Sequence, residues 1–593
     1  MGVPAGGYIW IVAGLPSNPR IAAAFALLGD LLEIDGASRH RVLAYRRAAE
    51  RVADLDRSFA ELAQGGRATE VPDIGDTLQA KAVELIETGD IAALAKLREK
   101  VPEGLAGIAK LRGLGPKRAL LLYEHRGIAG IDDLREALAA DGLSGVPGLG
   151  PKTVSQIASQ LAESERLGET ERVTIGRALP LAERLVADLA QVPGVERIQT
   201  AGGLRRGAEM VHDIDLAAAT TDPGGLSDAL AAHEAVARVV SAGKHRVTAE
   251  AQSGVLIELR TGPPESFGNL LQHLTGSAAH NTRLRERAVR LGLSVSEHGI
   301  TDSDGATAVH RTEAEVYEAL GLADIPPELR EDNDELDLAE AGRLPELIMA
   351  EDLRGELHAH TDWSDGRVSL KGMAAAARLR GYEYLVVTDH SPSQTQANGL
   401  DPTRLARQDE AIRKLDETLD GIRLLRGIEV DILRDGNLDC PDRILAGLDF
   451  VVASFHSGFT RPRNELTARL IAAADNPFVD VIGHPTGRML GSRPHSDVDL
   501  DALVEAAART DTALELNSQP RRLDLDARMA RVARDGGAML SIGADAHSVA
   551  AFDFRRFGLL TARRAGVEAH QVLNSRPWDE IAERRRKRIA AAP

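Results

Sequence analysis

Nine residues that could bind metal ions lie between positions 358 and 547. They are His358, His360, Asp365, His390, Glu429, His456, His484, Asp545 and His547. Almost every one follows a short run of aliphatic and β-branched residues, as in YLVVTDH and DFVVASFH. Such runs are typical of buried parallel strands. In a barrel of such strands the functional side chains gather at the carboxyl ends, so we expect the nine to meet there.

The donor atoms of this set are nitrogen and oxygen without sulfur, which favours manganese, zinc or iron(II) over calcium. One cation takes about four to six ligands, so nine predict two or three ions. Such ions can lower the pKa of a water and neutralise charge on a phosphoryl group. The residues therefore predict phosphoester hydrolysis. His298, His495 and Asp431 are left out of the set, although His495 could line a substrate entrance.

A second candidate site lies in the string AGGLRRGAEMVHDIDLAAA, which joins a glycine-rich turn and two arginines to a D-x-D strand. Asp213 and Asp215 face the same side of a strand because side chains alternate. The strand GVLIELR supplies a third acid, Glu258. Three such carboxylates can hold two magnesium or manganese ions for nucleotidyl transfer. An isolated D-x-D is also common on protein surfaces.

Three turns in the first third of the chain share a hydrophobic-glycine pattern: VPDIGDTLQAK (71–81), LRGLGPKRAL (111–120) and VPGLGPKTVS (146–155). Glycine permits positive φ and close approach, and the following helix offers free N–H groups to a phosphate. The turns resemble helix-hairpin-helix motifs, which bind the DNA backbone without recognising its sequence. The predicted DNA contacts are Gly75, Gly113, Gly115, Lys117, Gly148, Gly150 and Lys152. A net charge of −18 requires that such contacts be local.

The strings GGLRRG, DID, IELR, HLTGSAAHNTRLR and SEHGI occur in the order found in family X DNA polymerases. The resemblance runs from about residue 18 to the end, because bacterial members carry a C-terminal polymerase-and-histidinol-phosphatase (PHP) domain whose ligand pattern matches all nine residues. It implies that the nucleotide is bound by Gly202, Gly203, Arg206, Thr275, Gly276, Ser277, Asn281 and Arg285. It also places Lys81 at the Schiff-base lysine of a lyase site, which must be neutral to react. The alternative for Lys81 is a solvated helix residue.

The chain departs from the family pattern around the predicted nucleotide site. Gly203 replaces a serine, His212 a glycine and Glu258 an aspartate, while Arg246 and Thr248 replace lysine and serine. A glutamate shifts its oxygens by about one methylene on ions that tolerate little positional error. We therefore expect polymerisation to be weak or lost.

The patterns and the resemblance together predict a multidomain α+β and α/β chain. Its segments are a disordered extension (1–17), a lyase-like helical domain (18–95), helical fingers with helix-hairpin-helix motifs (96–170), a nucleotidyltransferase palm (171–265), a thumb (266–330), a solvated acidic linker (331–352) and a distorted (β/α)7 PHP barrel (353–593). The basic tail ERRRKRIAAAP is expected to be a solvated terminus, or else a DNA contact. The single Cys440 excludes disulfides and thiolate-rich zinc sites. The N-terminal GGYIWIVAGLP lacks a basic region and is too short to span a bilayer, so we expect a cytoplasmic protein with no membrane partner.

Three functions fit the sequence. The first is a DNA repair enzyme that joins a family X polymerase, with gap filling impaired, to a PHP 3′–5′ exonuclease; its partners are gapped or recessed DNA ends and deoxynucleoside triphosphates. Abasic-site cleavage and 3′-phosphate removal are the other PHP reactions that the resemblance implies. The second is a PHP phosphatase acting on a small phosphoester, as histidinol phosphatases do, although that substrate has no use for helix-hairpin-helix turns. The third is a PHP nuclease whose polymerase-like region only binds DNA.

Overall fold

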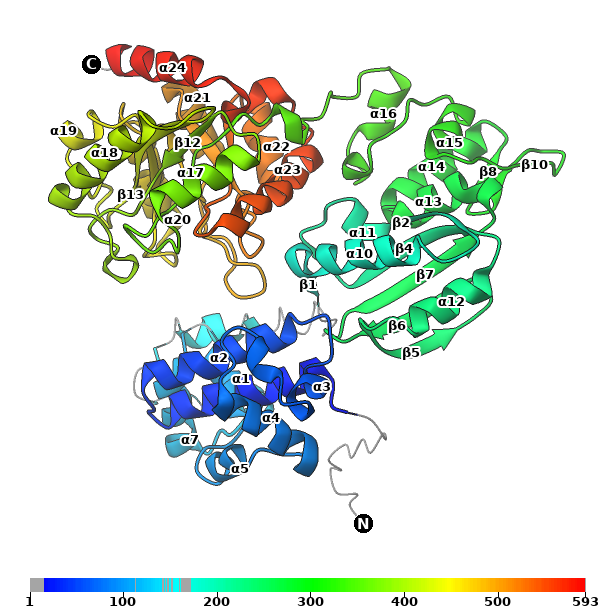
Figure 1. Ribbon diagram of the computed structural model, residues 1–593, viewed down its shortest axis with the longest axis horizontal. Coiled ribbons are helices and arrows are strands. Elements are labelled where there is room, and N and C mark those ends of the chain that lie inside the picture. The colour runs from blue at the N-terminus through cyan, green and yellow to red at the C-terminus, as the bar shows by residue number, and fades with distance from the viewer. Residues whose placement is uncertain are drawn as a thin grey trace.

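The computed structural model describes residues 15–111, 113–140, 143, 146, 149–150, 153–158, 160–161 and 172–591. Most of the predicted disordered extension, and the predicted DNA contacts Gly148 and Lys152, lie outside these residues. Within the described part of the chain, no helix is both long enough and apolar enough to cross a membrane. Figure 1 shows an N-terminal group of helices, a sheet with helices on it, and a barrel.

The N-terminal region is a bundle of short helices around one core that extends from Ile21 to Leu161. The lyase-like and fingers segments, predicted as two domains, therefore share one hydrophobic core. Glycine or proline in most of the connections ends a helix and lets the next one turn back onto the same apolar cluster. The helices are α1 (Asn18–Ile34), α2 (Arg39–Ala53), α3 (Phe59–Gln64), α4 (Asp76–Thr88), α5 (Ala92–Arg98), α6 (Leu105–Lys110), α7 (Gly115–Arg126) and α8 (Ile131–Ala139).

The next region is a five-stranded mixed sheet of order β2-β4-β7-β6-β5. Its strands are β2 (Val195–Thr200), β4 (Asp213–Thr220), β5 (Val236–Ala242), β6 (Arg246–Ala251) and β7 (Leu256–Gly262). A separate two-stranded sheet joins β1 (Val173–Thr174) to β3 (Met210–Val211). The helices are α10 (Ile175–Leu189), α11 (Gly202–Arg205) and α12 (Pro223–Ala231). The strand β4, between β2 and β7, is buried from Leu216 to Thr220 and exposes more of its first residues, so the D-x-D lies where the strand leaves the core.

The thumb region consists of α13 (Phe267–Thr275), α14 (Ala278–Arg290), β8 (Ser294–Ser296), β9 (Gly299–Thr301), β10 (Thr307–Ala308) and α15 (Glu313–Ala319). The acidic segment that follows is not a solvated linker, because α16 (Glu335–Glu340) packs Leu336 and Ala339 into the thumb core. The carboxylate of Glu335 is buried. Its Oε1 lies 2.8 Å from Nδ1 of His280 on α14, which compensates for the loss of solvent. The acidic composition of the segment predicts a solvated carboxylate. Instead, a partner distant in sequence satisfies it inside the protein.

The C-terminal region is a seven-stranded parallel sheet whose strands follow one another in chain order. They are β11 (Gly355–Glu356), β12 (Tyr384–Val387), β13 (Arg423–Asp431), β14 (Phe450–Ser454), β15 (Val481–Ile482), β16 (Ala513–Asn517) and β17 (Leu540–Gly543). The segments after β11 and β17 meet where His360 N donates to Ala546 O at 2.9 Å and Ala546 N donates to His358 O at 3.1 Å. These bonds nearly close the sheet and confirm the predicted distorted (β/α)7 barrel.

Helices follow the strands of the barrel and surround it, as Figure 1 shows in light green to red. They are α17 (Leu370–Leu379), α18 (Pro402–Asp416), α19 (Asp442–Leu445), α20 (Arg463–Ala474), α21 (Leu500–Thr510), α22 (Ala527–Asp535), α23 (Arg555–Arg564) and α24 (Trp578–Ala591). The basic tail is not a solvated terminus: Trp578 and Ile581 pack against strand residues, and Arg585 is 6% exposed. Asp480, which is also buried, forms ion pairs with Arg585 and Arg588 of α24.

Candidate active sites

The structure brings all nine predicted metal ligands to the carboxyl ends of the barrel strands. Ligand atoms of three overlapping groups lie within 4.8 Å of one another: His360, Asp365, His390 and His547; His358, His360 and Asp545; and His390, Glu429 and His456. The ninth residue, His484, joins them because its Nε2 is 3.0 Å from Glu429 Oε1. Among the residues that the structure describes, every such group lies in the barrel, and none includes the acids of the palm.

Glu429 lies at the centre of this cluster. Its two carboxylate oxygens are 2.9–3.6 Å from ring nitrogens of five histidines: His358, His360, His390, His456 and His484. The side chain is 1% exposed. Burial by itself raises a carboxyl pKa, but the surrounding histidines lower the pKa of Glu429 well below its usual range. One ionised carboxylate between several imidazoles is suited to bridging two cations.

The residues of the cluster fit metal ions. Several buried ring nitrogens make no hydrogen bond of adequate geometry in the described structure, although Glu429 oxygens lie near some of them: His358 Nε2, both nitrogens of His360, His390 Nδ1 and His484 Nδ1. An unsatisfied buried polar atom costs about 1–3 kcal/mol, so this many in one place requires a compensating ligand. Burial and the neighbouring His547 and His390 lower the pKa of His360 to about 3, which keeps its nitrogens available as electron-pair donors.

Two acidic residues behind the cluster were not predicted from the sequence. Glu515, on β16, accepts a hydrogen bond from His358 Nδ1 at 2.7 Å and another from His484 N at 2.7 Å. Asp431, excluded from the predicted set, has Oδ1 2.8 Å from His456 Nδ1. Each acid holds the ring nitrogen that faces away from the cluster, which directs the other nitrogen inward. An acidic residue inside the apolar strand TALELN is the sequence signal for Glu515. His495 is exposed.

The palm acids lie on two adjacent strands. Asp213 and Asp215 are on β4, and Glu258 on β7 is the direct neighbour of Asp215 in the parallel register. Burial, together with the nearby charges of Asp213 and Glu258, raises the pKa of Asp215 to about 7. Gly202 has φ +58°, and a Cβ there would collide with the Asp215 carboxylate, so only glycine fits this turn.

Glu258 is already engaged by two arginines. Arg246 Nη2 is 2.6 Å from its Oε2, and Arg260 Nε is 2.8 Å from its Oε1. Both carboxylate oxygens therefore have a cationic partner. One of the two partners, Arg246, stands where the family usually has a lysine. Two such charge-assisted bonds compete with any metal ion for the third palm acid.

Among the predicted nucleotide-binding residues, Arg206 lies against Thr275 and Gly276. Its Nη1 donates to Thr275 O at 2.6 Å and its Nε donates to Glu331 Oε1 at 3.0 Å. Ser277 accepts a hydrogen bond from His280 N and begins α14, next to Gly276. Three other predicted residues already have protein partners. Asn281 is buried, and its side-chain amide is hydrogen-bonded to Gln272 and to His273 O. Arg285 Nε donates to Asn281 O, and Gly203 lies against Val211.

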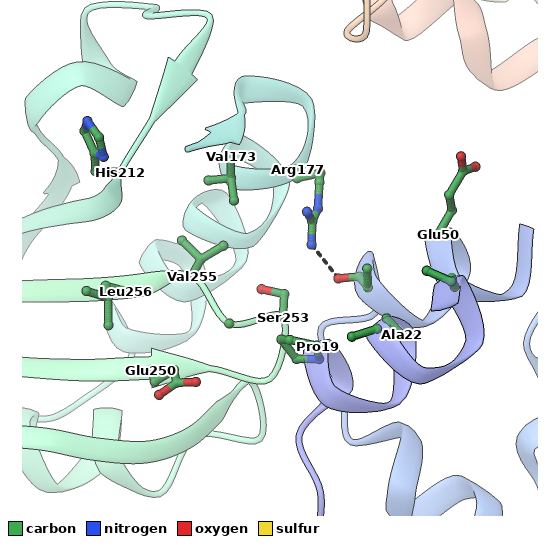
Figure 2. Close-up of a pocket in the computed structure, with 15 residues that line it drawn as sticks. Pro19, Ala22, Glu50, Val173, Arg177, His212, Glu250, Ser253, Val255 and Leu256 are labelled. Carbon is green, nitrogen blue, oxygen red and sulfur yellow. Dashed lines mark hydrogen bonds between the residues drawn. The ribbon is translucent and has the colours of Figure 1, made fainter. Parts of the chain in front are cut away.

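A cavity of about 640 Å³ lies between the N-terminal helices and the palm (Figure 2). Pro19 and Ala22 of α1 face the palm sheet across it, and Arg177 Nη2 donates to Ala53 O at 2.6 Å. His212 forms part of its lining and accepts a hydrogen bond from Arg172 Nε at 3.0 Å. The imidazole that replaces the usual glycine is thus exposed at the edge of the palm site, directly before Asp213.

The helix-hairpin-helix turns differ in their backbone. Gly113 and Gly115 have φ of +87° and +66° before α7, and Lys117 is exposed in its first turn. At the first turn the expected positive φ at Gly75 is wrong, because Gly75 has φ −101° and the left-handed residue is Asp73. Lys81 is half-buried in the middle of α4, and Gly150 is exposed.

Family models match four parts of the chain: a helix-hairpin-helix domain at residues 16–91, a SAM-like helix-hairpin-helix tandem at 105–163, a DNA polymerase beta thumb at 270–331 and a PHP domain at 356–519. The chain is also 36% identical over 553 residues to the DNA polymerase/3′–5′ exonuclease PolX of Bacillus subtilis (strain 168), a match covering 93% of this chain and 96% of that protein. The chain belongs to the PolX family. The resemblance to bacterial family X polymerases with a PHP domain is therefore confirmed.

Shorter proteins match only part of this PolX-family chain. A probable phosphatase of Thermoanaerobacter sp. (strain X514) is 30% identical over 233 residues, 37% of this chain and 89% of that protein. A probable phosphatase of Edwardsiella ictaluri (strain 93-146) is 33% identical over 234 residues, 37% of this chain and 90% of that protein. The PolX relative matches 93% of the chain and these phosphatases 37%, so a stand-alone phosphatase is not favoured.

Proposed function

We propose that this PolX-family chain is a DNA repair enzyme whose barrel removes nucleotides from 3′ ends of DNA in a metal-dependent 3′–5′ exonuclease reaction. The observation that carries the proposal is the set of nine clustered ligands whose buried ring nitrogens lack partners. Gapped or recessed DNA is the substrate, bound in part by the backbone amides of the helix-hairpin-helix turns at Gly75, Gly113, Gly115 and Gly150 and by Lys117. We place the enzyme in the cytoplasm.

The nine ligands would hold two or three ions, manganese or zinc, with Glu429 between them. When bound, such ions lower the pKa of water and neutralise charge on a phosphoryl group. The protein's own part is to fix the donors: Glu515 and Asp431 hold the outer nitrogens of His358 and His456, so that both Nε2 atoms face inward. No side-chain nucleophile is required, since water is the attacking group.

We further propose that the palm is a nucleotidyltransferase with impaired gap filling. Asp213, Asp215 and Glu258 would bind magnesium or manganese, and the turn at Gly202, Gly203 and Arg206 would face the triphosphate of a deoxynucleotide, with Thr275, Gly276, Ser277, Asn281 and Arg285 around its sugar and base. The pairing of Glu258 with two arginines supports weak metal binding there. Lys81 would form a Schiff base at an abasic site.

The two activities can be tested in one experiment. The protein and its His358→Ala and Asp213→Ala variants are incubated with manganese and end-labelled recessed or one-nucleotide-gapped duplexes, with and without nucleotides. We expect shortening that disappears in His358→Ala and persists in Asp213→Ala, and slow extension that Asp213→Ala abolishes. Gap filling at a rate typical of the family would contradict an impaired palm. Hydrolysis of histidinol phosphate without DNA shortening would support the small-phosphoester alternative, and shortening with no extension would leave the palm a DNA-binding module.

A further inference from the structure

One loop of the barrel touches three parts of the molecule. This bridging loop (residues 518–525) follows β16, and its Gln519 Nε2 donates to Asp545 O at 2.7 Å in the metal cluster. Pro520 packs so tightly on Gly176 of α10 that a Cβ there would overlap it. The next residue, Arg521, forms an ion pair at 3.2 Å with Glu50 of α2. The loop therefore connects the metal cluster to the palm and to the N-terminal helices.

The palm fixes the end of the bridging loop. Leu523 is 2% exposed and belongs to the hydrophobic core of the palm. Arg488 donates to Leu523 O and, at 2.7 Å, to Glu209 Oε1 of the palm. Asp524, also buried, accepts a hydrogen bond from Thr486 Oγ1 at 2.9 Å. The backbone on the carboxyl side of Arg522 is thus held by the palm core at Leu523 and by the barrel at Asp524.

Arg522 directs its guanidinium toward the metal cluster. Its Nε is 3.9 Å from Asp545 Oδ2, too far for a hydrogen bond, and the side chain is 21% exposed. Its charge also reaches His484, whose pKa is lowered first by burial and then by Arg522. An arginine that lies beside the ligands without bonding to them keeps its donors available for a substrate.

A second arginine lies near Arg522. Arg493 sits 3.8 Å above the centre of the Phe459 ring, and its Nε donates to Gly487 O at 2.7 Å. Burial and the charge of Arg522 lower the pKa of Arg493, whereas Asp524 acts in the opposite direction. Gly487 N in turn donates to O of the ligand His484 at 3.0 Å, which links Arg493 to the cluster through one residue. Two guanidinium groups placed in this way are suited to an anion with several oxygens.

We propose that Arg522 and Arg493 bind a non-scissile phosphate of the DNA strand whose 3′ end enters the barrel, and that the palm positions Arg522 through the bridging loop. This rests on the proposed exonuclease function and names a contact that a single phosphoester cannot make. Guanidinium groups bind phosphate oxygens in pairs, and each such contact adds salt dependence to binding. The polymerase part would thereby help the barrel to prefer a DNA strand over a small phosphoester.

The test compares two substrates in the full-length protein. One is a 3′-labelled single-stranded oligonucleotide, and the other is thymidine 5′-(4-nitrophenyl) phosphate, a small diester with no neighbouring phosphate. The variants are Arg522→Gln, Arg493→Gln and Arg522→Lys. Arg521→Gln is the matched control, because it is the adjacent arginine, 59% exposed and directed at Glu50. We expect Arg522→Gln to raise KM for the oligonucleotide about tenfold, the loss of one charge-assisted contact.

The salt dependence separates a phosphate contact from a structural role. For Arg522→Gln the slope of log KM against log salt should fall in magnitude by about 0.7, the value for one single-strand phosphate contact. Hydrolysis of the small diester should stay within twofold of wild type, Arg522→Lys should recover most of the slope, and Arg521→Gln should match wild type. Thermal unfolding of each variant identifies any that fails to fold, in which case Arg522→Lys and Arg493→Gln carry the test.

The outcomes distinguish this inference from the proposed function. A wild-type protein that degrades neither substrate contradicts the exonuclease assignment itself. If wild type degrades the oligonucleotide and Arg522→Gln keeps its KM and salt slope, the exonuclease stands and the phosphate contact is wrong. An equal loss on both substrates would also overturn the inference, because it would place Arg522 at the cluster instead of at the strand.

Discussion

Asp431 and Glu515 show how single residues outside a ligand set control it. Each accepts the outer N–H of an imidazole, which selects the tautomer and the ring orientation. We expect Asp431→Asn and Glu515→Gln to weaken metal affinity by about 10–100-fold, the usual effect of losing such a partner. Exonuclease activity of these two variants should then require more manganese, and it should recover when manganese is in excess. Activity of His358→Ala should not recover.

The measurement is a manganese titration of activity, with bound metal determined by elemental analysis. Asp435→Asn, an exposed carboxylate in the loop after β13, is the matched control and should titrate like wild type. Unchanged manganese dependence in Asp431→Asn would mean that His456 needs no orienting partner.

The ligands were predictable from the sequence, but their partners were not. A residue such as His390 follows its apolar strand directly, so strand pattern alone places it at the barrel end. Asp431 and Glu515 act on histidines that follow other strands, and that pairing depends on how the strands are arranged in space. The same holds for Arg206, whose partner Glu331 lies 125 residues later.

His280 in the thumb should make stability depend on pH. It is fully buried between Glu335 and Tyr317, and burial lowers its pKa below the ordinary value of 6.5, with Arg330 and Arg206 adding to the effect. As pH falls below about 6.5 the unfolded chain takes up this proton first, so stability is lost on acidification, by at most about 1.4 kcal/mol per pH unit for one proton.

The variant His280→Gln should therefore be less stable at pH 7 but lose less melting temperature between pH 7 and pH 5. His298→Gln, an exposed thumb histidine, is the control and should keep the wild-type slope. Equal slopes in wild type and His280→Gln would exclude a contribution from the buried imidazole.

Among the elements, α24 acts as a structural part of the barrel. Asp480 is 4% exposed and is paired by Arg585 and Arg588 of this helix. The substitution Arg585→Ala removes one of two cations from a buried carboxylate. It should lower the free energy of unfolding by up to about 3–5 kcal/mol, because Arg588 still pairs with Asp480 and compensates for part of the loss. Arg586→Ala, 71% exposed, should stay within about 0.5 kcal/mol of wild type. Chemical denaturation of the full chain measures both, and similar midpoints would show that α24 does not stabilise the barrel.

The two elements predicted wrongly from the sequence were mistaken for the same physical reason. Both the linker with α16 and the tail with α24 are rich in charge, and charge normally indicates a solvated segment. In each case the polar partner comes from a distant element: His280 for Glu335, and Asp480 for Arg585. The barrel strands and α1 were predictable because their apolar periodicity is local, whereas ion pairing between remote elements is not.

For the whole molecule, the palm and the barrel share one hydrophobic core. Phe557 of α23 is 2% exposed and packs with palm residues, and Leu560 lies against Gly207 of the nucleotide turn. Arg564 Nη2, on the same helix, donates to Glu331 Oε1, the carboxylate that also holds Arg206. A barrel helix therefore supports both the palm core and the predicted triphosphate-binding turn.

Phe557→Ala should for this reason separate the two parts. The lost side chain should cost about 3–5 kcal/mol, the range for a buried phenylalanine. Phe450→Ala, equally buried but inside the barrel, should cost a similar amount without affecting the contact with the palm. Calorimetry should show the palm and barrel transitions moving apart only in Phe557→Ala, with faster proteolysis between them. If Phe450→Ala separates the transitions equally, general destabilisation explains the effect and the shared core does not couple the two active sites.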